Sequence, residues 1–566
     1  MSYAEIAILT KVRNSQDTFT YQIPTDMNVS VGDFVIVPLQ SKTISGLVMN
    51  IHNTKPNYAT KPIILRDSDQ HSLPQIYCNF LSHISTSTLH SISNIAQTWI
   101  LTKPKRYALK HSQESISFAH QKSSTLHLYN SVAEVAPILE SIIKKSQGQV
   151  VIVCPRMQEV SALAQSLQHV LPKVHDKKLP SHEQYAFWES ALFDDKAIYI
   201  GTRSLTTLPF AHLDQLIILD DNALEHIQTE PTPHFSVHQI SRFYEQCTNV
   251  SYVSHTPSIE TMHRVMTKET VLDTSVVSKV HPYKLFLSNY HTQTQTEALT
   301  TDAKEYILMQ VELGKKIVLL CNKKGLYTGI YCRTCKSTTY DISQAVCPKC
   351  KSPTTFPIGK GVDQVRDEIA ILFPQFSIDT YTGEKDAKPT AQIVVATEAL
   401  LYSSYIQEFS AVALLSFESF AGLLANIYDE QHLENIISTI QVHNLELIVQ
   451  AKENLPSLWH DFCSHDLKRW YAQKIQSRKE YSLPPFAYFI TCTYEDTNAK
   501  KGALFVEAIL SQLKDELPKT CELSSALPKE YDKKIVFEFT ITAPHTITLE
   551  FLSLIKKHPI KIYSFN

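Results

Sequence analysis

Glycine is scarce in this chain of 566 residues, which contains only 12. None lies between Gly46 and Gly148, and nowhere is a Gly-Lys pair followed by Ser or Thr. A conventional phosphate-binding loop needs glycines whose backbone N–H groups wrap the phosphates, then a Lys, and a Ser or Thr that contacts Mg²⁺. The sequence therefore excludes a nucleotide-binding loop of this conventional type.

The chain also lacks a long hydrophobic run. No apolar stretch approaches the roughly 20 residues that a membrane-spanning helix needs, and no charged and then apolar leader is found. Of its 11 cysteines, all but four are scattered singly, which suits a reducing compartment better than a disulfide framework. We therefore expect a cytoplasmic protein with no membrane partner.

The net charge gives no strong attraction toward nucleic acid. It is −3 for the whole chain, so any such binding must rest on local patches. One candidate patch is the first 110 residues, which carry 10 Lys and Arg against 6 Asp and Glu. This surplus is small, and a solvated face would explain it equally well.

Four cysteines form the strongest motif of the sequence. Cys332, Cys335, Cys347 and Cys350 make a C-x2-C-x11-C-x2-C array with Pro and Lys in the second turn. Two such hairpin knuckles supply the four thiolates of a tetrahedral zinc site, which has no open position for water. We predict one structural Zn²⁺ that stabilises the fold and takes no part in catalysis.

Strand and helix patterns predict a multidomain α/β protein. Residues 1–105 contain short strands rich in β-branched and aromatic residues, followed by a helical stretch, which predicts a small β-rich domain. Two series of apolar strands alternating with helices, 125–275 and 283–460, predict two parallel-sheet lobes. The zinc knuckle, 331–352, is inserted in the second lobe. Residues 465–566 predict an α+β C-terminal domain.

The N-terminal strands carry a family resemblance. The runs TFTYQIP, VGDFVIVPL, ISGLV and KPIILRD are similar to the 3′-DNA-binding domain of primosomal protein N′, the PriA family of replication-restart helicases. The resemblance implies that Phe19 and Lys61 line a pocket for the terminal base of a DNA strand. Thr20 stands where the family usually has Asp, and Gln40 where it usually has Gly, so selectivity for a 3′ end stays open.

Further segments extend the resemblance in matching order. Residues 201–223, GTRSLTTLPFAHLDQLIILDDNA, are similar to a family segment that runs from a DNA-contacting motif into a Mg²⁺-binding motif. SHTPSIET at 254–261 and SLPPF at 482–486 also have counterparts. The resemblance implies two RecA-like lobes. DNA contacts are then expected from Thr202 and Arg203, and, beside the knuckle, from Lys349 and Lys351.

Three parts of the family's motor chemistry are absent. TLHLYNSVAEV replaces the glycine-rich loop, and no arginine lies between Arg366 and Arg469 to act on the transferring phosphoryl group. Asp220 and Asp221 are a remnant of the Mg²⁺-binding motif, in which the family has Asp, Glu, Glu and His. We therefore expect no catalytic residues, no ATP or Mg²⁺, and a motor retained as a scaffold, although the chain resembles an ATP-dependent DNA helicase.

Two family features are missing as well. Only about 20 residues separate the N-terminal domain from the first lobe, too few for the winged-helix domain that the family places there. The family also carries eight cysteines for two zinc ions, of which the outer four remain here. The chain resembles a shortened family member.

These observations predict a DNA-binding protein of replication restart and primosome assembly that recognises forked or 3′-ended DNA. The resemblance also implies replication-restart proteins and single-strand-binding protein as partners. Two alternatives remain open. One is an ATP-dependent 3′-to-5′ DNA helicase with an unconventional nucleotide site, and the other is a zinc-containing platform that binds replication factors.

Overall fold

In the residues that it describes, the computed structural model forms four successive units: an N-terminal unit, two lobes and a C-terminal unit. The description covers residues 2–12, 17–104, 123–230, 232–273, 283–289, 298–321, 329–335, 338–339, 346–347, 350–358, 360–383, 387–418, 427–451, 454–531, 534–548, 553–558 and 560–565.

The N-terminal unit is an antiparallel sheet followed by two helices. Its strands have the order β2-β1-β4-β3-β5. Gly46 allows β1 and β4 to approach, because a Cβ there would lie 2.4 Å from a methyl group of Ile6. The elements are β1 (Ser2–Ile8), β2 (Phe19–Ile23), β3 (Phe34–Leu39), β4 (Lys42–His52), β5 (Leu65–Arg66), α1 (Gln75–Thr88) and α2 (Ile92–Trp99).

The first lobe is a seven-stranded parallel sheet with the order β14-β6-β13-β10-β7-β9-β8. Strands covered on both faces read as continuous apolar runs, and all five residues of β7 are buried. The elements are β6 (Ser124–Leu128), α3 (Val132–Lys145), β7 (Gln149–Val153), α4 (Met157–Ser166), β8 (Lys173–Val174), α5 (Ser181–Phe193), β9 (Ile198–Gly201), β10 (Leu213–Leu219), β11 (Ile227–Gln228), β12 (Phe235–Ser236), α6 (Val237–Tyr244), β13 (Asn249–Ser254), α7 (Ile259–Met266) and β14 (Val271–Asp273).

The second lobe is a parallel sheet with the order β15-β23-β22-β16-β21-β20, and a small three-stranded sheet is inserted after β16. The main elements are β15 (Leu285–Asn289), α8 (Thr301–Glu312), β16 (Ile317–Leu320), α9 (Val362–Leu372), β20 (Ile378–Tyr381), β21 (Ile393–Ala396), β22 (Ala411–Leu414), α11 (Ile427–Val442), β23 (Glu446–Ala451), α12 (Ser457–Cys463) and α13 (Leu467–Glu480). The inserted strands are β17 (Gly329–Cys332), β18 (Thr338–Thr339) and β19 (Thr355–Ile358).

The C-terminal unit is an antiparallel sheet crossed by one long helix. Its elements are β24 (Ala487–Asp496), α14 (Ala499–Glu516), β25 (Glu522–Leu523), β26 (Leu527–Tyr531), β27 (Lys534–Pro544) and β28 (Lys561–Phe565). These findings confirm the predicted fold class: a β-rich N-terminal region, two RecA-like parallel lobes with an inserted cysteine segment, and an α+β C-terminal region.

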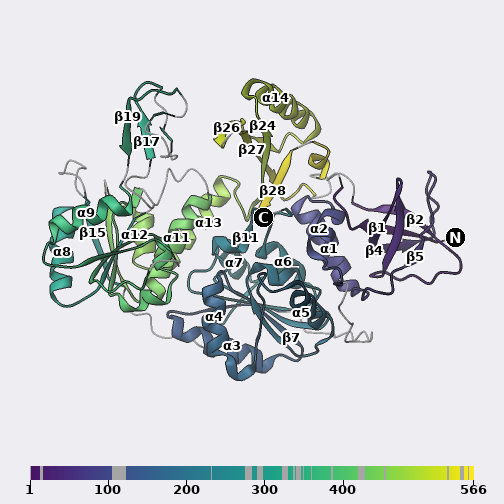
Figure 1. Ribbon diagram of the computed structural model, residues 1–566, viewed down its shortest axis with the longest axis horizontal. Helices are drawn as coiled ribbons and strands as arrows, with labels where there is room; N and C mark the ends of the chain where they lie inside the picture. The colour runs from purple at the N-terminus through teal and green to yellow at the C-terminus, as the bar shows by residue number, and fades with distance from the viewer. Residues whose placement is uncertain are drawn as a thin grey trace.

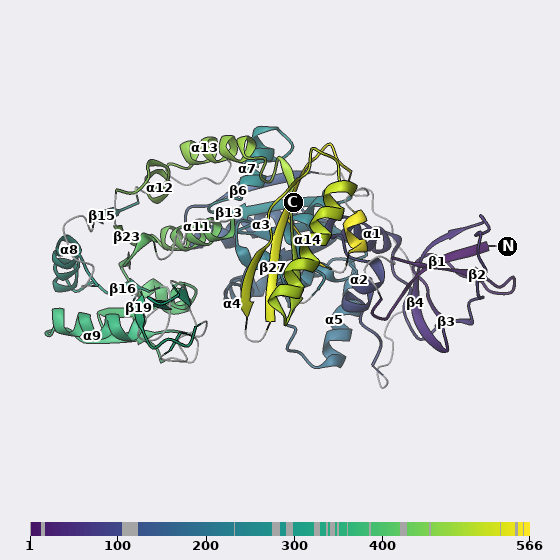
Figure 2. The same cartoon turned by 90° about the horizontal axis from the view of Figure 1, so that it is seen from above.

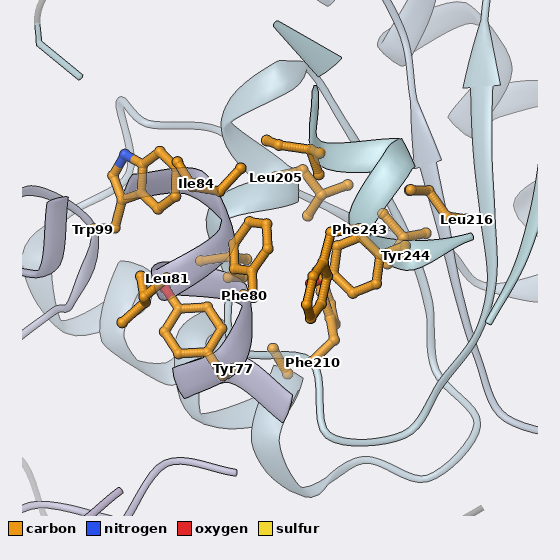
Figure 3. Close-up of a cluster of buried hydrophobic side chains, with 14 of the residues drawn as sticks. Tyr77, Phe80, Leu81, Ile84, Trp99, Leu205, Phe210, Leu216, Phe243 and Tyr244 are labelled. Carbon is orange, nitrogen blue, oxygen red and sulfur yellow. The ribbon is translucent and has the colours of Figure 1, made fainter. Parts of the chain in front are cut away.

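Helix α1 shares a hydrophobic core with the first lobe. The Phe80 ring lies 5.4 Å from the rings of both Phe243 and Tyr244 in α6, measured between centroids. The hydroxyl of Tyr77 donates to the carbonyl oxygen of Thr207 at 2.6 Å. Figure 3 shows these aromatic rings interleaved between α1 and α6. The N-terminal helices are therefore packed into the lobe and are not merely tethered to it.

The C-terminal unit also contacts the N-terminal helices. Leu89 packs into the C-terminal core. Lys556 donates to the carbonyl oxygen of His90 at 3.3 Å and lies 3.6 Å from the Asp17 carboxylate. In Figures 1 and 2 the C-terminal unit lies beside α1 and the first lobe, while the second lobe lies on the opposite side from the N-terminal sheet. No helix within the described residues is long and apolar enough to cross a membrane.

The shared core predicts that Phe80 is essential for the packing of α1 against the first lobe. Replacing this fully buried ring by Ala leaves a cavity, so Phe80→Ala should lower the free energy of unfolding by about 3–5 kcal/mol. The midpoint of the first urea unfolding transition, followed by tryptophan fluorescence, measures this. The matched control is Leu504→Ala on α14, where the side chain is 68% exposed and the change should be within about 0.5 kcal/mol. Equal shifts in both variants would contradict the shared core.

Candidate functional site

The four cysteines of the predicted knuckle lie together. Their sulfur atoms are all within 4.8 Å of one another, with 3.5 Å between Cys332 and Cys350 and 3.6 Å between Cys335 and Cys347. None forms a disulfide. Tetrahedral zinc with Zn–S bonds of about 2.3 Å holds its sulfurs about 3.8 Å apart. The cluster therefore fits a zinc ion with four protein ligands and no open position.

A tight turn shapes the second half of the knuckle. The backbone N–H of Lys351 donates to the carbonyl oxygen of Cys347 at 2.8 Å, and Lys351 has a left-handed φ of 59°. Its side chain is exposed, as a phosphate contact requires. Lys349, the neighbouring predicted DNA contact, lies outside the described residues. Both remain predictions.

Phe19, one of the two predicted pocket residues, and its neighbour Thr20 lie on opposite faces of the N-terminal sheet. Phe19 packs against the apolar core, whereas Thr20 faces outward and donates to the Glu5 carboxylate at 2.7 Å. The Lys61 ammonium group is 3.4 Å from the carbonyl oxygen of Gln40. Gln40 has a φ of 53°, a conformation that suits glycine, which the family usually has there. The structure thus brings Lys61 and Gln40 together and points Phe19 and Thr20 apart.

The predicted contacts of the first lobe lie at the end of β9. Thr202 precedes a short 3-10 helix (Arg203–Thr207). One guanidinium nitrogen of Arg203 donates to the carbonyl oxygen of Glu225 at 2.9 Å. This bond holds Arg203 against its own lobe, so a DNA contact from it stays a prediction.

Asp220, predicted as the first remnant of a Mg²⁺-binding motif, is half-buried and hydrogen-bonded within the protein. It follows β10 with a left-handed φ of 44°. The Tyr129 hydroxyl lies 2.7 and 2.8 Å from the two Asp220 oxygens, and the His255 backbone N–H donates to one of them at 3.2 Å. Burial raises the pKa of Asp220 to about 6, although these hydrogen bonds oppose the rise. Both carboxylate oxygens already have donors where a metal would have to bind.

The segment that replaces the glycine-rich loop is very short. Only residues 129–131 connect β6 to α3. The carboxylate of Glu134, in the first turn of α3, accepts a hydrogen bond from the backbone N–H of Asn130 at 2.9 Å. A helix N-terminus attracts anions, but here the protein's own carboxylate occupies that position. A phosphate approaching this end of the helix would meet a negative charge.

Asp221 is used inside the lobe as well. One of its oxygens accepts hydrogen bonds from the Thr261 hydroxyl at 2.6 Å and from the Ser258 backbone N–H at 3.2 Å. Ser258 and Thr261 form the N-terminal cap of α7. The side chain of Asp221 is buried, so it connects β10 to α7 and does not reach a solvent-filled cleft.

The next residue, Asn222, joins the two lobes. Its side-chain amide donates to the Glu434 carboxylate on α11 at 3.1 Å, and Gln431 donates to its carbonyl oxygen at 2.6 Å. Burial raises the pKa of Glu434 to about 7, against the opposing effects of Asn222 and the more distant Arg478. The end of β10 is therefore in direct contact with α11.

Two further contacts close the same interface. The Thr256 and Ser438 hydroxyl oxygens lie 2.9 Å apart, so they share a hydrogen bond between the lobes. The Arg156 guanidinium lies 3.6 Å from the centre of the Tyr402 ring, a cation–π contact across the lobes. In this structure, side chains from both lobes fill the region between β10 and α11.

Sequence reasoning missed Tyr129 and Glu134, although both lie in the segment TLHLYNSVAEV. An acidic residue in the first helical turn after a strand is a usable signal for a self-capped helix. The Tyr129–Asp220 bond has no comparable local signal, because its partners are separated by 91 residues.

Comparisons with known proteins support the resemblance. Residues 5–100 match the family model of the PriA 3′DNA-binding domain. The replication restart protein PriA of Chlamydia pneumoniae is 22% identical over 410 residues, which are 62% of this chain and 54% of that protein. PriA of Synechocystis is 23% identical over 419 residues, 63% of this chain and 50% of that protein. The chain thus spans about half the length of these relatives.

Two solved structures have a fold that is similar in part to this chain. They are a DEAD box protein from Methanococcus jannaschii and Dbp5 of S. cerevisiae bound to RNA and ADP BeF3. The TM-scores are 0.32 and 0.34, each at 8% identity. The matches cover 63% and 71% of this chain and 87% and 92% of those chains. At these scores the likeness carries no functional argument. The chain is thus similar to the PriA 3′DNA-binding domain over residues 5–100 and to a series of PriA replication restart proteins over about three fifths of its length.

Proposed function

We propose that this protein binds forked or 3′-ended DNA during replication restart and acts without hydrolysing ATP. The observation that carries the DNA-binding half of the proposal is the match of residues 5–100 to the 3′DNA-binding domain. The antiparallel sheet of this region is intact, and Lys61 on it remains exposed. Contacts from lysines to phosphates would dominate the affinity and make it sensitive to salt.

The inactive motor is supported by how the nucleotide site is filled. Binding of a nucleotide with Mg²⁺ would have to displace Tyr129 from Asp220 and bring phosphates against the Glu134 carboxylate. Asp221, at the position of the catalytic Glu, is committed to the cap of α7. Loss of an arginine finger alone costs about 10³–10⁵ in rate, and this chain has no arginine in the corresponding region.

In this proposal the lobes act as a scaffold. Packing of α1 on α6 and the bonds of Asn222 to α11 join the N-terminal sheet, the first lobe and the second lobe into one body. DNA held by the N-terminal sheet would therefore keep a fixed position relative to the cysteine segment and the C-terminal unit.

A second candidate function is a zinc-containing platform for replication proteins. The observation that favours it is the position of β17 and β19, which project from the second lobe in Figure 1. A structural zinc would hold this projecting segment in one conformation, suitable for a protein partner.

ATP hydrolysis and DNA binding, measured together, test the proposed function. The purified zinc-loaded protein should bind forked DNA with an affinity that falls steeply between 50 and 200 mM salt, at roughly the slope expected for several phosphate contacts. It should show no DNA-stimulated ATP hydrolysis, because Asp220 and Asp221 are bonded internally. Turnover that is abolished by Asp220→Ala would contradict the inactive motor and favour a helicase with an unconventional site. ATP hydrolysis that persists unchanged in Asp220→Ala would indicate a contaminating ATPase.

The dependence of stability on pH tests the lobe interface. The buried Glu434 keeps its proton up to about pH 7, whereas in the unfolded chain it loses it near pH 4.5. The folded state therefore loses stability as the pH rises through this window, by about 3 kcal/mol in total. Glu434→Gln cannot ionise and can still accept from Asn222. It should match the wild type at pH 4 and be more stable than it at pH 8.

Thermal unfolding at both pH values measures this difference. Glu312→Gln on α8 is the matched control, because Glu312 is exposed and should show no difference between the two pH values. A Glu434→Gln variant that is less stable than the wild type at pH 8 would show that Glu434 is charged in the interface.

Metal content tests the predicted zinc site. One equivalent of zinc should bind per chain, and Cys347→Ser should lose it because Cys347 is a buried ligand. The predicted zinc site has no open coordination position for catalysis. Loss of the metal should therefore weaken the binding of a protein partner to the cysteine segment. Binding of forked DNA through the N-terminal sheet should be kept. Metal content by mass spectrometry and fork binding by anisotropy measure the two effects, with Cys247→Ser as a control cysteine outside the cluster. Unchanged zinc content in Cys347→Ser would exclude the four-cysteine site.

A further inference from the structure

An exposed tyrosine between two exposed lysines lies on the loop that follows β4. Lys55, Tyr58 and Lys61 are spaced three residues apart in the segment KPNYATK, and all three are exposed. The Tyr58 side chain is 58% exposed, which is unusual for an aromatic residue in this protein. Tyr58 is not among the residues predicted to line the base pocket.

Hydrogen bonds hold the Tyr58 ring in place. Its hydroxyl lies 2.6 Å from the Thr20 hydroxyl oxygen. The Thr20 hydroxyl is also 2.7 Å from the Glu5 carboxylate, which can only accept when ionised. Because Thr20 has one hydrogen and gives it to Glu5, the Tyr58 hydroxyl donates to Thr20. The chain Tyr58–Thr20–Glu5 fixes the end of the ring and leaves its remaining surface in solvent.

Glu5 remains charged beneath this loop. Partial burial favours its neutral form, but hydrogen bonds from Thr20, Thr18 and His52 hold the pKa of Glu5 below its usual range. A phosphate would be repelled from the position directly beside Glu5. An uncharged, flat group such as a nucleobase meets no such repulsion at the Tyr58 ring.

The flanking lysines are free to bind phosphates. Among the described residues, no carboxylate oxygen lies within 4.0 Å of the ammonium groups of Lys55 or Lys61, which appear in none of the ion pairs of the structure. The hydrogen bond from Lys61 to Gln40 is long, at 3.4 Å. Exchanging this hydrogen bond for one to a phosphate oxygen would therefore cost little free energy. A cationic surface with an aromatic ring is the usual combination for binding a single strand.

We propose that Lys55, Tyr58 and Lys61 form a contact for single-stranded DNA, in which a nucleobase stacks on Tyr58 and the two lysines bind phosphates on either side. This inference rests on the proposed DNA-binding function and adds Tyr58 and Lys55 to it. The bound DNA is single-stranded, because duplex DNA keeps its bases stacked inside the helix, where they cannot stack on the Tyr58 ring.

The ring is tested with Tyr58→Ala and Tyr58→Phe in the full-length zinc-loaded protein. Tyr58→Ala should weaken binding to a fork with a single-stranded arm about tenfold and leave binding to blunt duplex DNA unchanged. Tyr58→Phe keeps the ring and should stay within about threefold of the wild type. Tyr481→Ala is the matched control, because Tyr481 is 68% exposed at the end of α13 and should have no effect. Thermal unfolding verifies that each variant is folded.

A base analogue reports stacking directly. The fluorescence of 2-aminopurine placed in the single-stranded arm should fall on binding to the wild type and to Tyr58→Phe, and should not fall with Tyr58→Ala. For the lysines, Lys55→Ala should reduce the slope of log affinity against log salt by about 0.7, the value for one phosphate contact on a single strand. Lys178→Ala, an exposed lysine in the first lobe, is its control.

The outcomes separate this inference from the proposed function. Absence of binding by the wild type to any DNA would overturn both. Tight fork binding by the wild type with equal affinity for Tyr58→Ala would overturn only the stacking contact. An equal loss in Tyr58→Phe and Tyr58→Ala would also overturn it, because the ring would then be irrelevant.

Discussion

Three consecutive residues at the end of β10, the half-buried Asp220 and the buried Asp221 and Asn222, determine how this molecule is held together. A buried carboxylate or amide needs hydrogen-bond partners, since leaving such a group unpaired costs several kcal/mol. Asp220 takes its partner from the end of β6, Asp221 from the cap of α7, and Asn222 from α11 in the other lobe. These three residues thus connect four elements of this protein to one another.

This arrangement differs in its physical demands from a motor. A motor cleft has to open and close, so the groups lining it must be satisfied by water or nucleotide in one state and by protein in another. Here Asn222 and Thr256 bond directly to α11, and Arg156 stacks on Tyr402 across the lobes. Opening this interface would separate these paired groups and leave each without its partner. A fixed relation between the lobes is the state that these contacts favour.

Much of the fold could be predicted from the sequence, because the signals are local. Apolar runs such as β7 and β10 indicate buried parallel strands, and the spacing of Cys332 to Cys350 indicates a metal knuckle. The contacts made by Asp220 and Asn222 could not be predicted in this way. Tyr129 and Asp220 are 91 residues apart, and Asn222 and Glu434 are 212 apart. Such pairs depend on strand order and on the docking of the lobes, which no local pattern encodes.

The same reasoning explains how the fold could persist without the motor residues. Catalytic groups are commonly held in strained or poorly satisfied environments, and replacing them often stabilises a protein. In the proposed function, Tyr129 gives the half-buried Asp220 carboxylate a donor, and Asn222, where the resemblance implies Glu, gives the buried carboxyl group of Glu434 an amide donor. Each of these contacts supplies a hydrogen-bond partner from within the protein. The left-handed φ of Asp220, 44°, sets the turn after β10 that directs the side chains of Asp220, Asp221 and Asn222 toward different elements.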